Sequence, residues 1–248
     1  MSTYKSYPDI LFFLGAGASI DAGLVGVVEL KHKFMTWLEK NSKSEHLSLT
    51  NEILEILEAW KSKRSDKNPV DIEFLLETVE KIENKDEDPL PDFYENKVLK
   101  LEKNGSYNSI MKIKKDLSTM IKRFIKTYFS QTNIQTDYLQ CIKDLKYSRP
   151  LRIFSTNYDR CIEQLCKKND LQLIDAFDPN LKLQKREYEK QNVDVILYKL
   201  HGSITWHRTE KGDYARSDII PTTDERVSYI NGQDVVPVIL YLLYLVDY

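Results

Sequence analysis

The chain has 248 residues, of which 42% are hydrophobic and 30% are charged, a composition typical of a globular protein. Its 36 basic and 38 acidic side chains give a net charge of −2, which argues against a general attraction to nucleic acid or anionic membrane. Its three cysteines form no disulfide framework or C-x-x-C metal pair, and the N-terminus lacks a signal-peptide pattern. We therefore expect a cytoplasmic protein.

The first predicted element is a central, fully buried strand over residues 9–14, because the run is apolar on both faces. The glycine- and alanine-rich turn Gly15–Ser19 follows it. From about Val27 the spacing of apolar residues becomes helical, and Pro69 and Asp71 indicate one helix start. A long helix is predicted from about 106 to 129. Its basic residues are predicted to form a solvated face: Lys112, Lys114, Lys115, Lys122, Arg123 and Lys126.

Strands and helices alternate in the second half of the chain. PLRIFSTNYD runs from an apolar strand into a polar turn, CIEQLCKK is helical with Cys161 and Cys166 as buried thiols, and LQLIDAFD and DVILYKLHGS are strand-like. This order predicts an α/β fold, a Rossmann-like three-layer parallel sheet with a large helical insertion subdomain. The predicted core spans 1–27 and 146–248, and the insertion spans 28–145.

The apolar segment VVPVILYLLYLV, residues 235–246, is the one candidate for a membrane span. Its 12 residues fall short of the ~20 that a spanning helix needs. We predict a buried strand or a short core helix there, and no membrane partner.

Three of the predicted strands end in unusual loops: GAGAS, STNYD and HGS. The carboxyl ends of parallel strands meet at one sheet edge, where ligands bind, so these loops are predicted to lie together. Gly15 and Gly17 allow backbone N–H groups and the following helix N-terminus to approach a phosphate. Ile20 stands where the G-x-G-x-x-G fingerprint needs a small residue. A tight turn without a ligand is the alternative.

The polar residues of the other two loops suggest chemistry. Asn157 can orient a hydroxyl or a water because its amide both donates and accepts, and Asp159 can accept from an amide. The alternative is that either residue caps the helix beginning near Tyr158. His201 is a natural proton acceptor near neutrality, with a structural histidine as the alternative. The other histidines are read as structural, on helix surfaces or in loops: His32, His46 and His207.

In combination, these motifs resemble the sirtuin fold, and more closely the sirtuin-like domains of bacterial anti-phage defence NADases. The matching segments are 9–23, 151–162 and 194–206. The resemblance implies a domain that binds NAD and cleaves its nicotinamide–ribose bond. It implies Asn157 as the residue that positions a ribose hydroxyl or the attacking water, and His201 as the base. The implied NAD-binding residues are Gly15, Ala16, Gly17, Ala18, Ser19, Gly23, Thr156, Asp159, Gly202 and Ser203.

The chain also departs from the sirtuin pattern. No cysteine follows Cys166, so the four-cysteine zinc module of the protein deacylases is absent and no zinc is expected. Gly-Leu-Val at Gly23–Val25 replaces the family's Gly-Ile-Pro. After Gly202 only Gly212 and Gly232 remain, and neither sits in the glycine-serine turn that meets the adenosine end.

The first two departures favour hydrolysis of free NAD, as substrate, to nicotinamide and ADP-ribose. The alternatives are a non-catalytic module that binds NAD or ADP-ribose and, less favoured, an NAD-dependent protein deacylase. An enzyme that destroys NAD harms its own cell, so we expect an abortive-infection effector with low basal activity. Activation would come from a homo-oligomer or a partner defence protein, for example a nucleic-acid-sensing or ATPase subunit. No direct nucleic-acid binding is expected.

Overall fold

The structure, a computed structural model, divides into two compact units. One unit, here called the sheet unit, comprises Met1–Leu24 and Phe129–Tyr248; the other, the helical unit, comprises Val25–Tyr128. The structure describes residues 11–82, 107–144, 150–175, 177, 192–208, 214–216, 229–230, 233–234 and 237–239.

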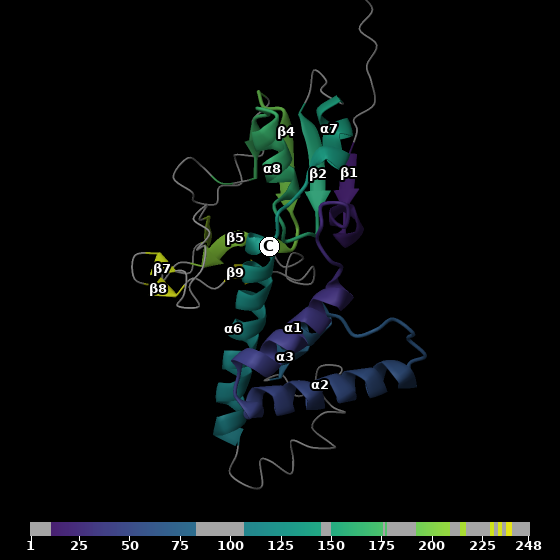
Figure 1. The fold of residues 1–248 in the computed structure, drawn as a ribbon, viewed down its shortest axis with the longest axis vertical. Helices are drawn as coiled ribbons and strands as arrows, with labels where there is room; N and C mark the ends of the chain where they lie inside the picture. Colours follow the sequence, from purple (N-terminus) through teal and green to yellow (C-terminus); the bar gives the residue numbers. More distant parts are fainter. Residues whose placement is uncertain are drawn as a thin grey trace, which may run out of the picture. The chain divides into compact units, whose positions relative to one another are not determined.

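The sheet unit contains a four-stranded parallel sheet in the order β1-β2-β4-β3, of which Figure 1 labels β1, β2 and β4. Its strands are β1 (Leu11–Leu14), β2 (Leu151–Ser155), β3 (Leu173–Ile174) and β4 (Val195–Lys199). Its helical segments are η1 (Ala16–Ser19), η3 (Asp137–Leu139), α7 (Gln140–Asp144) and α8 (Cys161–Lys168). The predicted α/β Rossmann-like fold, with strands alternating with helices, is therefore confirmed.

Antiparallel strands follow the parallel sheet along the chain. A three-stranded sheet has the order β6-β5-β9, and β7 pairs with β8. The strands are β5 (Gly202–Arg208), β6 (Tyr214–Arg216), β7 (Tyr229–Ile230), β8 (Gln233–Asp234) and β9 (Pro237–Ile239). β9 lies inside the apolar segment 235–246, in line with the strand alternative, and the rest of that segment lies outside the described residues. No helix in the described part of the chain has the length and apolarity needed to cross a membrane.

The prediction that the first strand is central and fully buried is wrong. In the described sheet β1 pairs with β2 alone and forms an edge. Leu11 and Phe13 are 61% and 68% exposed, whereas Phe12 and Leu14 are partly buried. A central strand and an edge strand with one open face can have the same apolar sequence, because the local pattern does not depend on which strands lie beside it.

The helical unit is built on aromatic packing between helices. Phe124 lies with its ring centroid 5.5 Å from that of Phe34 and 5.7 Å from that of Trp37. The predicted helix start is confirmed, since the Asp71 side chain caps a helix by accepting from the Phe74 N–H at 2.8 Å. The helices are α1 (Val27–Asn41), α2 (Ser44–Lys63), α3 (Ile72–Lys81) and α6 (Tyr107–Gln131), the last continuing into the sheet unit.

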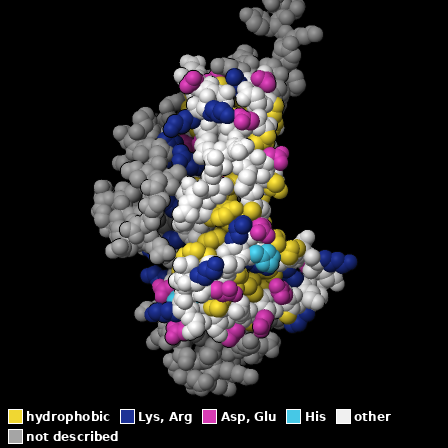
Figure 2. Space-filling model, in the orientation of Figure 1, with side chains coloured by type: hydrophobic (Ala, Val, Ile, Leu, Met, Phe, Trp, Pro, Cys, Tyr) yellow, Lys and Arg dark blue, Asp and Glu magenta, His cyan; other side chains and the backbone are white. Residues whose placement is uncertain are grey.

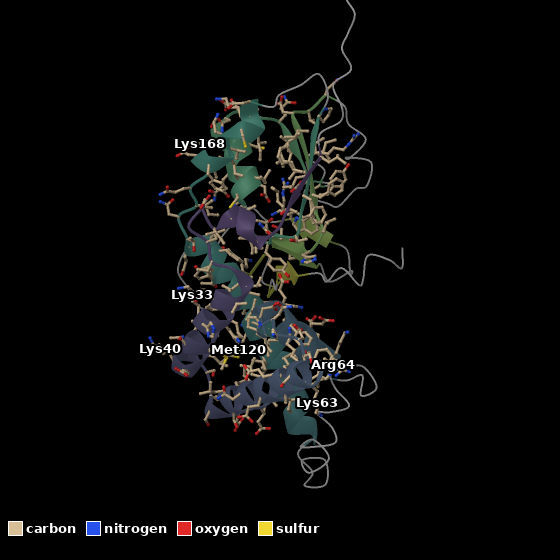
Figure 3. The ribbon with its side chains drawn as sticks, turned by 90° about the vertical axis from the view of Figure 1, so that its right-hand side faces the viewer. Lys33, Lys40, Lys63, Arg64, Met120 and Lys168 are labelled. Atoms are coloured by element: carbon tan, nitrogen blue, oxygen red, sulfur yellow. The ribbon has the colours of Figure 1, made fainter. Side chains whose placement is uncertain are left out.

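The solvated face predicted for the long helix is only partly correct. Lys122 forms an ion pair with Glu80, and Lys126 is 8% exposed, so both are drawn into the packing of the helical unit. Lys40 and Lys63 lie at the surface of this unit (Figure 3). On the face drawn in Figure 2, basic and acidic side chains are interspersed.

Two histidines also differ from their predicted places. His46 is 8% exposed on α2, with its Nε2 3.8 Å from the Asp116 carboxylate, rather than at the surface. His207 is buried in β5 rather than in a loop. His32 is exposed on α1, as predicted.

The compact units place one boundary differently from the predicted insertion of 28–145. Residues 129–144 belong to the sheet unit. Two hydrogen bonds join this segment to the residues after β1: the Tyr138 hydroxyl donates to the Ala18 carbonyl, and the Gln135 N–H donates to the Ala22 carbonyl at 3.1 Å.

Candidate functional site

The loops that follow β1, β2 and β4 meet at the carboxyl edge of the parallel sheet, as its topology predicts. The Thr156 N–H donates to the Leu14 carbonyl at 3.0 Å and thereby joins the first two loops. The Leu200 N–H donates to the Ser155 carbonyl at 2.8 Å and joins the second loop to the third. Three segments far apart in sequence are therefore adjacent here.

The glycine turn continues directly from β1 into η1, which has four residues. Its first hydrogen bond runs from the Ala18 N–H to the Gly15 carbonyl at 2.9 Å, so the N–H groups of Ala16 and Gly17 stand outside the helical pattern. A side chain built on Gly17 would meet no atom within 4 Å, so the turn is open there. The helix predicted from about Val27 is confirmed as α1, which begins at Val27, so the helical segment that follows the turn directly is the four-residue η1.

Backbone conformation alone explains two of the predicted glycines. Gly23 has φ +88° and Gly202 has φ +82°, in the left-handed region that favours glycine. Gly202 and Ser203 form the start of β5 and so lie in a strand, rather than in the loop that the HGS motif predicted. Ser203 is fully buried, with its hydroxyl 3.1 Å from that of Thr205.

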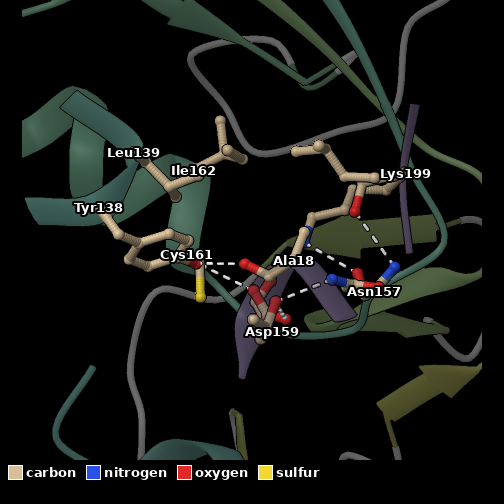
Figure 4. A pocket seen from close by; sticks show the side chains of 11 residues that line it. Ala18, Tyr138, Leu139, Asn157, Asp159, Cys161, Ile162 and Lys199 are labelled. Carbon is tan, nitrogen blue, oxygen red and sulfur yellow. Dashed lines mark hydrogen bonds between the residues drawn. The ribbon is translucent and has the colours of Figure 1, made fainter. Parts of the chain in front are cut away.

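A hydrogen-bond network connects the glycine turn to the STNYD loop (Figure 4). The Asn157 amide nitrogen donates to the Gly15 carbonyl at 2.9 Å and to the Ser19 hydroxyl at 2.8 Å. The Ser19 hydroxyl in turn donates to Asp159 Oδ2 at 2.7 Å. The structure thus brings together Gly15, Ser19, Asn157 and Asp159, which were predicted from separate motifs.

Asp159 and Asn157 differ in what they leave available to a ligand. α8 begins at Cys161 rather than near Tyr158, and its N-cap residue, Arg160, makes no side-chain cap hydrogen bond. The Asp159 carboxylate is buried, and its second oxygen accepts from the Cys161 N–H at 2.9 Å. Both of its oxygens are engaged. The Asn157 side-chain oxygen accepts from none of the described residues, so it is the free acceptor of this network.

A small pocket lies beside the network, and the side chains drawn in Figure 4 line it. Burial raises the pKa of the Cys161 thiol to about 12, so this thiol is protonated near neutrality and a poor nucleophile. Burial also raises the pKa of Tyr138. The residues lining the pocket are Leu14, Ala18, Ser19, Tyr138, Leu139, Ser155, Asn157, Asp159, Cys161, Ile162 and Lys199.

Sequence reasoning missed two charged residues at this site. Lys199 ends β4, and its ammonium donates to the carbonyls of Asn157, at 3.1 Å, and Asp159. It also lies 3.4 Å from the carboxylate of Glu163 on α8. Burial raises the pKa of the Glu163 carboxyl, while the Lys199 charge opposes that shift. The available signal was a lone lysine at the end of an apolar strand, in the segment VILYK.

His201 lies in the turn between β4 and β5. Its ring centroid is 6.2 Å from that of Tyr158, and both ring nitrogens are buried without a hydrogen bond to the described residues. Burial lowers its pKa below the ordinary value of 6.5, so the imidazole is neutral near pH 7.

Two further observations complete the site. The Thr156 hydroxyl lies 3.4 Å from the Leu14 carbonyl, so its nearest bond is within the protein. Within the described ranges, no group of three or more His, Cys, Asp and Glu side chains is arranged to hold a metal ion.

We predict that Ser19→Ala destabilises the fold by about 1–3 kcal/mol, because it leaves the buried Asp159 oxygen without its donor. Urea unfolding followed by circular dichroism measures the loss. Ser130→Ala is the matched control, since the Ser130 hydroxyl is buried with no hydrogen-bond partner among the described residues. Equal effects of the two substitutions would contradict the role given to Ser19.

Comparison with models of protein families gives a match for part of the chain. The family model described as a SIR2-like domain matches residues 151–239, which include the STNYD and HGS motifs and leave the glycine turn outside. No curated protein matches the chain. SIR2-like domains use NAD as a substrate, and members of the family are generally NAD-dependent enzymes. Residues 151–239 of the chain are therefore similar to a SIR2-like domain.

Proposed function

We propose that the chain is an NAD⁺ glycohydrolase, which cleaves the nicotinamide–ribose bond and releases nicotinamide and ADP-ribose. The observation that carries the proposal is the network from Gly15 through Ser19 and Asn157 to Asp159, beside the loop that bears His201. It joins a turn open to a ligand and a free amide oxygen, and the neutral imidazole of His201 belongs to the turn after the neighbouring strand β4.

The chemistry of the reaction suits these groups. Nicotinamide is already cationic in NAD⁺, so it departs as a neutral molecule and needs no strong acid. The bond from the anomeric carbon to the ring nitrogen breaks and its electron pair goes to nicotinamide. A water oxygen bonds to the same carbon and gives its proton to a base. The site must orient the reactants, accept that proton and limit access of other water.

We assign Asn157 Oδ1 to hold a ribose hydroxyl or the attacking water, and His201 to accept the proton. The turn at Gly15 and Gly17 would approach the pyrophosphate with its backbone. Asp159 would accept from the nicotinamide carboxamide with the lone pairs that its two hydrogen bonds within the protein leave unused, provided that a ligand reaches this buried carboxylate.

A second candidate is a non-catalytic module that binds NAD or ADP-ribose. The observation that favours it is the His201 ring, because none of the described residues hydrogen-bonds to it and fixes its orientation. A base normally needs such an orienting partner. The two candidates differ in whether bound NAD is cleaved.

We predict that His201→Ala and Asn157→Ala each lower the rate of nicotinamide release by about 10²–10⁴-fold. NAD affinity should stay within about threefold, since removing a group that acts in the transition state changes kcat more than binding. Chromatography measures nicotinamide, and calorimetry measures NAD binding. His32→Ala, at an exposed histidine of the helical unit, is the control.

Three outcomes would count against the assignment. Unchanged release from the double variant His201→Ala/Asn157→Ala would show that these residues do not carry the reaction. NAD binding by the wild-type protein without any release would favour the non-catalytic module. Deacetylation of an acetyl-lysine peptide coupled to NAD consumption would favour a protein deacylase.

The pH dependence follows from the lowered pKa of His201. A base acts unprotonated, so we expect nicotinamide release to be level between about pH 7 and 8 and to fall only below about pH 6.5. The same shift makes folding stability full above the unfolded pKa near 6.5 and reduced below it, because the unfolded chain binds a proton that the folded chain does not. A pH–rate profile with its acid midpoint above 6.5 would contradict this.

We further propose that the activity serves anti-phage defence and is restrained until the chain assembles with a second copy or a partner protein. The reason is functional, since unrestrained hydrolysis of NAD would harm the cell that makes the enzyme. We expect nicotinamide release per molecule to rise with protein concentration, in parallel with oligomer size measured by light scattering. Full activity in the dilute monomer would refute the restraint.

A further inference from the structure

Lys199 carries a charge in a place that burial makes unfavourable. Its side chain is 2% exposed, at the last residue of β4. Removing an ammonium from water costs free energy unless its three N–H donors all find acceptors. The Lys199 ammonium therefore needs hydrogen-bond acceptors, and the identity of those acceptors indicates the role of the residue.

The ammonium has three acceptors within reach. Two are the main-chain carbonyls of Asn157 and Asp159, the former at 3.1 Å. The third is the carboxylate of Glu163 at 3.4 Å. The Asn157 carbonyl lies closer than the carboxylate, and the other Glu163 oxygen is buried without a hydrogen bond to the described residues. The loop carbonyls are therefore the principal partners.

These two carbonyls belong to the residues that reach the glycine turn with their side chains. The Asn157 amide donates to Gly15 and to Ser19, and the Asp159 carboxylate accepts from Ser19. The backbone of this loop is thus held by Lys199 at the same residues whose side chains are held by the turn. Nothing else in the described chain bonds to both carbonyls.

Lys199 also stands next to the turn that bears His201. Its neighbour Leu200 donates its N–H to the Ser155 carbonyl, and His201 follows. One residue therefore connects the backbone of the asparagine loop to the strand end from which the histidine projects. The Ile204 N–H also donates to the Tyr158 carbonyl at 3.2 Å, so Lys199 adds side-chain bonds to backbone bonds between the same two segments.

We propose that Lys199 is a positioning residue that binds the backbone of residues 157–159 and so holds the Asn157 amide in register with His201. Its kinetic consequence rests on the proposed NAD hydrolysis, whereas its effect on the loop does not. Lys199 touches no substrate in this role and acts through Asn157.

The first experiment measures loop order by amide hydrogen exchange in the full-length protein. Lys199→Met keeps the length of the side chain and removes its donors, so we expect the peptide spanning Ser155–Cys161 to exchange about tenfold faster or more. Glu163→Gln retains a side-chain oxygen beside Lys199 and should leave this peptide within about twofold of wild type. Lys122→Met, which breaks the ion pair with Glu80 in the helical unit, is the matched control.

The second experiment measures steady-state kinetics at a temperature well below unfolding, with rates expressed per folded molecule. Displacing a catalytic group by about 1 Å costs on the order of 100-fold in rate, so Lys199→Met should lower kcat by roughly that factor. KM for NAD should stay within about threefold, because the glycine turn is untouched. A residue that only stabilised the fold would lower the unfolding temperature and leave kcat per folded molecule unchanged.

Lys199→Met leaves the Glu163 carboxylate without its cation, and the variant could therefore fold poorly. The double variant Lys199→Met/Glu163→Gln removes that carboxylate as well, and it should show the same faster exchange. Unchanged exchange of Ser155–Cys161 in the lysine variants overturns the proposal. An equal loss of kcat in Glu163→Gln overturns it too, because the ion pair would then be the active element. Absence of nicotinamide release from the wild type refutes the proposed function, while the exchange comparison still decides the role of Lys199.

Discussion

The buried hydrogen bond from the Ser19 hydroxyl to the Asp159 carboxylate is the interaction on which the arrangement of this site depends. It joins the residues that end the first turn and the second loop, 140 positions apart in sequence. A carboxylate with 5% exposure needs a donor for each oxygen, and the second donor is the first N–H of α8. The Asp159 side chain thereby connects the start of α8, the edge of the sheet and the glycine turn.

The hydrogen bonds within the network order the site and also leave few of its polar atoms without a partner. Most polar atoms in the network bond to each other, so few groups at this sheet edge lack a partner among the described residues: the Asn157 oxygen, the buried ring nitrogens of His201 and the backbone near Gly17. These are an acceptor, a neutral base and an open main chain. Hydrolysis of a bond to a cationic ring needs groups of these kinds, because the reactants must be oriented and a proton accepted, whereas no strong acid is required.

Much of this could be predicted from sequence, because the relevant information is local. An apolar run that ends in glycine, asparagine or histidine identifies a strand and its loop, and parallel strands bring such loops to one edge. That logic placed Gly15, Asn157 and Asp159 together. It failed at β1, because the exposed fraction of Leu11 depends on which strands lie beside it. It also missed Lys199 and Tyr138, whose acceptors lie far away in the chain and leave no periodic trace.

The edge position of β1 has a consequence for how the glycine turn is supported. In the described sheet this strand exchanges ladder hydrogen bonds on one side only, so its backbone receives about half the pairing of an interior strand. The bend that follows it is therefore secured mainly by side chains, from Asn157 and Tyr138, rather than by the sheet. Local opening of the glycine turn would need the loss of these few hydrogen bonds and would leave the pairing of the other strands intact.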